Sequence, residues 1–417
     1  MTRSDSVSIR VRHEKAVRRA PVEWGVRALL AVVAACLAYV SVGHTFAYSL
    51  RRTAVERAHG LAGSDGRITA LLSQKMLAEQ GVAAGPEAAI LARTALRSDA
   101  TAVAAVSTLG LDAQAHGRTQ EARKWFTYAS ALSRRDFQTQ LWLIEDAVSR
   151  GDVGGALHHY DVALRTSASA PDILYPVLIS AIENLDVRKG MARILAARPV
   201  WASSFLLYTS GNAPDLRAMA DLFHDVSRRG GAIPSEAQAY AVDRLVKQRD
   251  LEMAWHYYAG LRGVKDRNRS RDQHFTADLP FPSTMDWNPA SGGEIVVSLQ
   301  RGDGHGVVDF SGPPNIGGVL LRQTQLLAPG SYVLEGHSAN VDLPEGAAPY
   351  WTLICDNGRE LGRVAVPNSG QNHGNFVGRF TVPAGCPVQS LALAATPVNN
   401  QTGLSGQIYA VALRPLS

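Results

Sequence analysis

A 34-residue recurrence constrains this 417-residue chain more than any other feature of its sequence. Five positions recur one period later with their residue types preserved: Leu109, Gly117, Ala122, Phe126 and Ala129 return as Leu143, Gly151, Ala156, Tyr160 and Ala163. A fixed period of this length is typical of stacked helix-turn-helix units, because each unit buries its apolar face only against its neighbours. The alanines would let paired helices approach closely, the aromatic residues would fill the space between units, and the glycines suit turns with positive φ.

The recurrence weakens on both sides of this pair of units. Weaker echoes lie one period earlier or later, at Ala88, Ala95, Val177, Gly190, Ile194 and Ala197. Ala254 and Tyr258 keep the same spacing of four residues but fall four residues short of a whole number of periods. An irregular connection is therefore expected between Trp201 and Ser235, and residues 53–265 are predicted to form a helical repeat array.

The segments "LGLDAQAHGRTQEARKWFTYASALS" and "LIEDAVSRGDVGGALHHYDVALR" resemble the tetratricopeptide repeat. Leu109-Gly110, Ala122, Phe126 and Ala129 occupy that family's characteristic places, although its early-helix Trp and closing Pro are absent. The resemblance implies an α-solenoid that binds a protein partner in a concave groove lined by the first helices. The candidate groove residues are Gln114, Glu145, Asp146 and Ser149, each with an ordinary solvated surface role as the alternative.

The cluster of reactive side chains around His116 and Glu121 is expected to be structural. His116 lies immediately before the turn glycine and Glu121 beside the packing alanine, so repeat geometry explains their proximity. No nucleophile, base and orienting group occur together there, as a catalytic site would require.

An apolar segment, Ala28–Leu50, runs for 23 residues without a formal charge at neutral pH. As a helix it would be about 34 Å long, enough to cross a hydrocarbon core of about 30 Å. Seven basic residues precede it and only three follow closely, so the positive-inside bias places the N-terminus in the cytoplasm. Residues 1–27 are thus predicted to be a basic cytoplasmic tail and residues 28–50 a single transmembrane helix.

A signal peptide cleaved between Ala47 and Tyr48 is the alternative. An uncleaved anchor is favoured, because the apolar segment is longer than the usual stretch of about 7 to 15 residues and Thr45 is a poor match to the cleavage site. Either interpretation exports residues 53–417. The Ala- and Arg-rich composition and the order of modules indicate a bacterial inner-membrane protein with most of its chain in the periplasm.

The charge and cysteine content agree with export. Residues 1–52 hold nine Lys/Arg and three Asp/Glu, which leaves 33 basic and 34 acidic residues in the rest of the chain. The basic pI of about 9.1 is therefore no indication of nucleic-acid binding. Cys355 and Cys386 are the two cysteines beyond the membrane segment, and an oxidising compartment favours a disulfide between them over two buried free thiols.

The C-terminal third predicts a different class of structure. Residues 266–280 read as a charged, Pro-containing linker. Residues 281–417 hold eight or nine short strand candidates, from "EIVVSLQ" to "GQIYAVALR", separated by Gly, Pro, Asn and Asp, as in a β-sandwich or jelly roll. The order of "VVDFSG", "WTLICDNG" and "FTVPAGCPVQSLAL" resembles the galactose-binding-like, carbohydrate-binding type of sandwich.

That resemblance implies contact with a sugar, although a fold alone does not confer it. Trp287 and Trp351 are the candidates for stacking on a sugar ring, with core packing as the alternative for both. The candidate polar partners are His337, Arg322, Asn357 and Asp356. Four carboxylates that a glycosidase would use in pairs are scattered through the domain, at Asp286, Glu294, Asp309 and Glu335.

The sequence thus predicts a multidomain α + β protein: a transmembrane helix, a tetratricopeptide-like α-solenoid and a C-terminal β-sandwich. The expected function is a non-catalytic periplasmic scaffold, with protein partners in the helical groove, polysaccharide on the sandwich, no cofactor, no metal and no nucleic acid. A role in envelope or exopolysaccharide assembly follows from the modules. The alternatives are a polysaccharide-binding module protein and a polysaccharide hydrolase or lyase.

Overall fold

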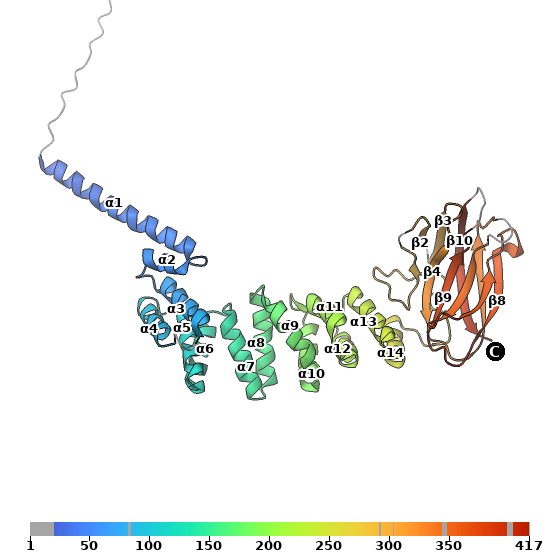
Figure 1. Cartoon of the computed structure of the whole chain (residues 1–417), viewed down its shortest axis with the longest axis horizontal. Coiled ribbons are helices and arrows are strands. Elements are labelled where there is room, and N and C mark those ends of the chain that lie inside the picture. Colours follow the sequence, from blue (N-terminus) through green and yellow to red (C-terminus); the bar gives the residue numbers. More distant parts are fainter. Residues whose placement is uncertain are drawn as a thin grey trace, which may run out of the picture. The chain divides into compact units, whose positions relative to one another are not determined.

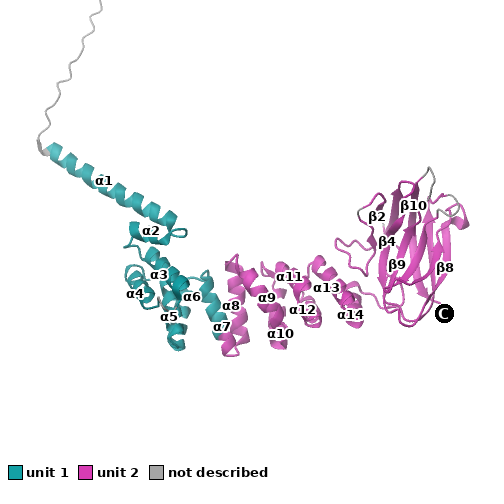
Figure 2. Cartoon of the chain, viewed as in Figure 1, with its two compact units in different colours: residues 1–146 teal, residues 147–417 magenta. Residues whose placement is uncertain are grey.

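The computed structural model describes residues 21–81, 85–291, 293–302, 304–343, 348–397 and 403–416. Most of the predicted basic tail, residues 1–20, lies outside the described residues. The fold is multidomain α + β, with helices followed by a two-sheet antiparallel sandwich (Figure 1). The chain divides into two compact units, Met1–Asp146 and Ala147–Ser417 (Figure 2), and each is described by itself.

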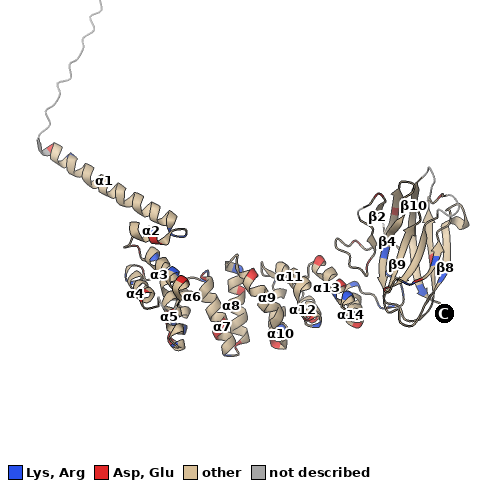
Figure 3. Ribbon diagram, in the orientation of Figure 1, with Lys and Arg blue, Asp and Glu red and all other residues tan. Residues whose placement is uncertain are grey.

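The first unit is helical. Its elements are α1 (Pro21–Leu50), α2 (Val55–Leu61), α3 (Gly66–Gln80), α4 (Gly85–Ser98), α5 (Val103–Ala115), α6 (Thr119–Leu132) and most of α7 (Phe137–Ser149). Among the described residues, α1 is the one helix long and apolar enough to cross a membrane, judged by length and composition. Acidic and basic residues are interspersed along the later helices, whereas most of α1 carries neither (Figure 3).

The end of α1 packs onto the helices that follow it. Ala47 is fully buried in a cluster with Ala58, Ala62 and Ile68, against which Leu50 also packs. Ala58 belongs to α2 and Ile68 to α3. The last turn of the apolar helix is therefore part of the helical core of this unit.

The predicted packing positions of the repeat are confirmed in this unit. Ala122, Phe126 and Ala129 are fully buried, and the Phe126 ring stacks on Trp142 with centroids 4.5 Å apart. A Cβ on Gly110 would lie 2.7 Å from the Phe126 ring, so only glycine permits this approach of α5 to α6. Gly117 has the φ of +72° that its turn position requires.

The second unit begins with further helices. They are α8 (Val153–Thr166), α9 (Ala170–Ala181), α10 (Leu185–Ala196), α11 (Ala202–Asn212), α12 (Leu216–Arg228), α13 (Ser235–Lys247) and α14 (Leu251–Arg262). The predicted positions Ala156, Tyr160, Ala163, Ala254 and Tyr258 are buried, as expected.

The predicted irregular connection between Trp201 and Ser235 is wrong, because α11 and α12 occupy it. The N-cap residues of α8, α10, α12 and α14 are Asp152, Asn184, Asp215 and Asp250, so successive second helices begin 32, 31 and 35 residues apart. The four residues by which Ala254 and Tyr258 fall short of a whole number of periods are thus distributed over several regular helical pairs. Met219 stands in α12 at the place where α6, α8 and α14 have alanine, which removed the recognisable pattern.

The intermediate repeat also packs in a different register from the predicted one. Val177 is half exposed, and burial in α9 falls on Leu174 and Leu178 instead. In α10 the buried positions include Met191 and Leu195 rather than Ile194 and Ala197. Gly190 keeps its predicted role, since a Cβ there would clash with Leu157 of α8.

The sandwich consists of two five-stranded sheets. The first sheet has the order β1-β4-β9-β6-β7 and the second the order β2-β3-β10-β5-β8, with antiparallel pairing throughout. The strands are β1 (Asn288–Pro289), β2 (Val296–Gly302), β3 (His305–Gly312), β4 (Gly318–Gln325), β5 (Gly330–Ala339), β6 (Tyr350–Cys355), β7 (Glu360–Ala365), β8 (Asn375–Val382), β9 (Gln389–Ala395) and β10 (Leu404–Pro415). The predicted disulfide is confirmed: Cys355 at the end of β6 is bonded to Cys386 before β9.

The predicted linker, residues 266–280, is instead built into the sandwich. Ser270 N donates to Leu413 O at 3.0 Å and Val411 N donates to Gln273 O at 2.9 Å, so this segment pairs with the second half of β10. Arg271 is buried, and its guanidinium donates to Gln325 Oε1 and to the carbonyl oxygens of residues 285 and 324. The charged composition of this segment indicated a linker, but one of its charged side chains, Arg271, belongs to the interior of the sandwich.

The last helical pair is joined to the sandwich. Val242, Tyr258, Met285 and Leu326 form a shared buried cluster. Asp286, at the centre of this junction, accepts hydrogen bonds from the Tyr258 hydroxyl, from Arg262 and from the backbone and hydroxyl of Ser283. Burial raises the pKa of the Asp286 carboxyl, but these donors outweigh it, and the net pKa lies below its usual value.

Candidate functional site: a polar groove on the sandwich

The two tryptophans proposed to stack on a sugar belong to the core. Trp351 is fully buried and Trp287 is 5% exposed, and their rings meet edge to face with centroids 5.7 Å apart. The Trp287 Nε1 donates to Asp272 O. The alternative of core packing is therefore correct, and neither ring lies on the exposed surface of the sandwich.

The predicted polar partners are not brought together by the fold. His337 is exposed on β5 in the second sheet, whereas Arg322 is exposed on β4 in the first sheet. Asn357 lies in the turn after β6, where its Oδ1 accepts from the backbone of Arg359. Asp356 is paired with Arg249 at 2.6 Å. Of this set, His337 lines a groove of the second sheet.

One of the four helical groove candidates is also excluded. The Asp146 side chain is 4% exposed and forms an ion pair with Arg123, with Nη2 2.6 Å from Oδ1. A residue buried in this way supports the packing of α6 against α7 rather than binding a partner. Gln114 and Glu145 are exposed in the first unit, and Ser149 is exposed at the start of the second.

A groove of about 580 Å³ crosses the outward face of the second sheet. Its floor is low because Ala410 and Ala412 are the outward residues of β10 beside β5. One wall carries Asn375 and Val377 of β8, in register with His337 and Glu335 of β5. The other wall is the 266–280 segment, which contributes Gln273 and His274.

Side chains that suit sugar hydroxyl groups continue beyond the groove. Gln407 donates to Asp309 at 2.8 Å and accepts from Asn340 and from the Tyr409 hydroxyl. The Tyr409 side chain is exposed, and its ring lies 6.0 Å from that of His337. Amides both donate to and accept from hydroxyls, carboxylates accept from them, and an exposed aromatic ring can cover the apolar face of a sugar.

A strained turn borders the groove. Asn372, His373 and Gly374 all have positive φ, at +51°, +53° and +76°. Such consecutive left-handed residues are costly and persist only where surrounding contacts hold them, here including the hydrogen bond from Ser338 Oγ to Gly374 O. Asn372 lies in the groove wall, and Asn375 Nδ2 donates back to its carbonyl. This hydrogen bond holds the Asn375 amide at one end of the groove.

Sequence reasoning missed Asn375, Gln407 and Tyr409. In "GQIYAVALR", strict alternation puts Gln407 and Tyr409 on the face opposite to Ala410 and Ala412, and only the register shift between Ile408 and Ala410 brings them onto one face. Alternation alone did not say that this face is concave, because the wall is made by the distant 266–280 segment. Within the described ranges, no group of three or more His, Cys, Asp or Glu side chains is placed to hold a metal ion.

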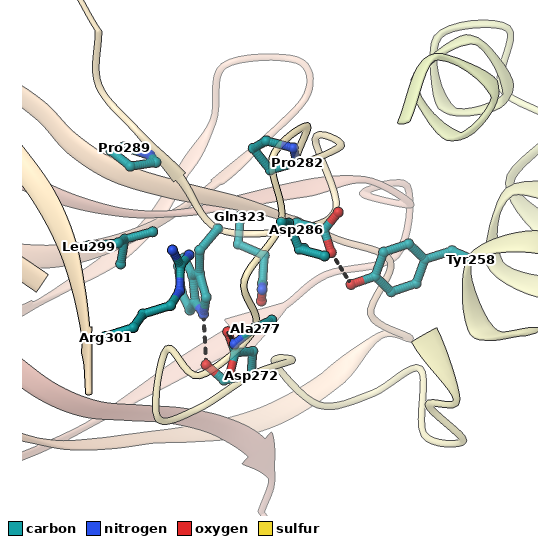
Figure 4. A pocket seen from close by; sticks show the side chains of 11 residues that line it. Tyr258, Asp272, Ala277, Pro282, Asp286, Pro289, Leu299, Arg301 and Gln323 are labelled. Atoms are coloured by element: carbon teal, nitrogen blue, oxygen red, sulfur yellow. Dashed lines mark hydrogen bonds between the residues drawn. The ribbon is translucent and has the colours of Figure 1, made fainter. Parts of the chain in front are cut away.

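A second cavity of about 240 Å³ lies at the edge of the sandwich between the two sheets (Figure 4). Pro282 and Pro289 line it together with Leu299 and Arg301 of β2. The Tyr258–Asp286 hydrogen bond of the helical junction lies at its side (Figure 4). It shares no lining residue with the groove.

No protein-family model matches the chain, and no curated protein sequence is similar to it. Solved structures with partial likeness include the enzymatically active domain of tailspike protein 4 of bacteriophage CBA120, at 13% identity and a TM-score of 0.25, covering 32% of this chain and 20% of that one. A CBM22-1 xylan-binding domain from Paenibacillus barcinonensis has 13% identity and a TM-score of 0.24, covering 37% of this chain and 98% of that one. The Glycosylation Associate Protein (Gap123) complex from Streptococcus agalactiae has 11% identity and a TM-score of 0.21, covering 29% of this chain and 39% of that one. Likeness at these TM-scores does not establish a relationship.

Proposed function

We propose that this protein is a non-catalytic, membrane-anchored scaffold of the bacterial periplasm whose sandwich binds a glycan along the groove of the second sheet. The observation that carries the proposal is the set of polar and aromatic side chains in that groove and directly beside it. Exposed His337 and Tyr409 lie close to the amides of Asn372, Asn375 and Gln407. On β5 the groove is lined by residues 335–337, which extend about 7 Å along the strand, enough for one sugar ring.

A binding role is favoured over hydrolysis by the state of Glu335. Arg414 donates to both of its carboxylate oxygens and lowers the pKa of Glu335. A glycosidase acid needs a raised pKa so that it can protonate the leaving oxygen. Asp309 is engaged by Gln407. These two carboxylates of the predicted enzyme alternative therefore act as an ion-pair partner and a hydrogen-bond acceptor.

Anchoring through an uncleaved helix is supported by Ala47. The alternative cleavage site lies directly after this residue, which is fully buried among Ala58, Ala62 and Ile68. Cleavage would remove one member of that cluster. The basic residues before the apolar helix support a cytoplasmic N-terminus and, for residues 53–417, a periplasmic location.

The helical array is proposed to be tetratricopeptide-like and to bind a protein of the envelope or exopolysaccharide assembly machinery. Gln114 and Glu145 are its exposed candidate contacts. Charge-reversing or truncating them, as in Gln114→Ala with Glu145→Lys, is expected to abolish capture of the partner by affinity purification from crosslinked cells. The matched control is Glu87→Lys on α4, and capture that survives the Gln114 and Glu145 changes would contradict this assignment.

The glycan proposal is tested with the full chain in detergent on an array of immobilised neutral and acidic oligosaccharides. Binding is expected, and the double variant His337→Ala with Tyr409→Ala is expected to weaken it at least tenfold without changing the thermal midpoint. Tyr240→Ala is the matched control, because Tyr240 is an exposed tyrosine on α13 outside the groove. An array without any bound glycan, or unchanged binding by the double variant, would refute the proposal.

A further inference from the structure

The cavity at the edge of the sandwich has apolar walls. One cationic side chain that lines it, Arg301, keeps most of its hydrogen-bond donors for a ligand. The walls include Trp287, Leu299, Pro282 and Pro289. A cavity of roughly 150 Å³ holds a benzene ring, so the 240 Å³ of this cavity accommodates one six-membered sugar ring. The C–H faces of a sugar ring match the apolar walls.

Most polar groups in the cavity are already engaged. The Asp286 carboxylate is held by Arg262 and Ser283, and Tyr258 donates to it. Asp272 turns its carboxylate toward the backbone N–H groups of residues 276 and 277. The Gln323 amide both accepts from Arg271 N and donates to Arg271 O. These groups shape the cavity without offering a strong donor to a ligand.

Arg301 is different. Its partner in the described part of the chain is Asp278, through an Nη1–Oδ1 contact of 3.3 Å. The Asp278 side chain is 87% exposed, and an exposed pair of this kind contributes little. The guanidinium keeps most of its five donors for a ligand, and a carboxylate matches its planar fork better than a hydroxyl does.

We infer that this cavity is a binding site for a single sugar ring carrying a carboxylate, the end unit or a side branch of an acidic glycan. The ring lies against the apolar walls, and its carboxylate replaces Asp278 on Arg301. The site is separate from the groove of the second sheet, and it stands whether or not that groove binds a polysaccharide.

The test uses the full chain in detergent with sodium glucuronate as the probe and glucose as the neutral comparison. Saturation-transfer NMR is expected to give a saturable glucuronate signal, with glucose at least tenfold weaker. Arg301→Gln removes the charge and is expected to weaken glucuronate binding about tenfold or more. Ala277→Leu fills the cavity and is expected to abolish binding, while Arg359→Gln, an exposed arginine in the turn after β6, leaves it unchanged.

Three results would overturn the inference. Equal binding of glucose would show that the carboxylate is not recognised. Unchanged glucuronate binding by the Arg301→Gln and Ala277→Leu variants would place the sugar elsewhere. Loss of glucuronate binding in the His337→Ala, Tyr409→Ala double variant would assign it to the groove. Thermal unfolding of each variant separates loss of the site from loss of the fold.

Discussion

The hydroxyl of Tyr258 on the last helix donates a 2.8 Å hydrogen bond to the buried carboxylate of Asp286 in the sandwich. Arg262 completes the junction with two further hydrogen bonds to the same carboxylate. Breaking a buried pair leaves one charge without compensation and costs about 3 to 5 kcal/mol, whereas losing one neutral donor costs about 1 kcal/mol. In the second unit, the attachment of the last helix to the sandwich therefore depends on the side chains of Tyr258, Arg262 and Asp286.

The first prediction concerns this junction. Asp286→Ala is expected to lower the free energy of unfolding by about 3 kcal/mol, the lower end of the range for a buried pair, because it leaves the partly buried Arg262 guanidinium without its carboxylate. Tyr258→Phe is expected to cost about 1 kcal/mol. Denaturant unfolding of the full chain in detergent measures both. Similar losses for the two variants would contradict a junction centred on the carboxylate.

The second prediction is a pH dependence of the same junction. The folded pKa of Asp286 is depressed, so its contribution is complete above the unfolded pKa of about 4 and is lost as the pH falls through the folded value. Burial raises the pKa of the neighbouring Asp243, so protonation of Asp243 as the pH falls stabilises the folded state and opposes the loss from Asp286. The difference in thermal midpoint between wild type and Asp286→Asn should therefore shrink below about pH 4. A constant difference down to pH 3 would argue against it.

The third prediction concerns Gly110. Gly110→Ala places a methyl group 2.7 Å from the Phe126 ring, so α5 and α6 must separate. Overpacking of this kind costs about 1 to 3 kcal/mol. Gly260→Ala on α14 is the control, since no atom lies within 4 Å of the added Cβ, and it is expected to be neutral or to stabilise by up to about 1 kcal/mol. Circular dichroism melts compare them.

The fourth prediction concerns the disulfide. Cys355 and Cys386 are 31 residues apart, and closing a loop of that size restricts the unfolded chain by about 3 to 4 kcal/mol. Cys355→Ala with Cys386→Ala should therefore unfold the sandwich at lower denaturant concentration. Added reductant should shift wild type to the same midpoint. A reductant effect on the double variant would point to another cause.

The fifth prediction concerns the N-terminus. Because Ala47 is buried in the helical core, the protein isolated from membranes should retain its apolar helix, so that mass spectrometry of its peptides covers residues on both sides of Tyr48. Alkaline carbonate should leave it in the membrane fraction. A mature chain beginning at Tyr48 would instead support the signal peptide.

Local patterns predicted the elements well, and distant partners account for most of the errors. The 34-residue spacing identified the buried positions around Phe126, because packing between neighbouring helices repeats in sequence. The burial of Asp146 was invisible, since it depends on Arg123 in another helix. Arg271 misled in the same way, because two of its partners, Thr324 and Gln325, lie more than 50 residues away. The concave surface around His337 could be recognised only in the folded structure, because one of its walls is the distant 266–280 segment.

The order of the second sheet has a consequence for how the sandwich is made. Its central strand, β10, is the last one in the chain, and it pairs with β3, with β5 and with the segment around Ser270. During synthesis the earlier strands of this sheet emerge before the strand that lies between them. The sheet can close only when residues 404–415 have left the ribosome, so folding of this domain is late and dominated by long-range pairing.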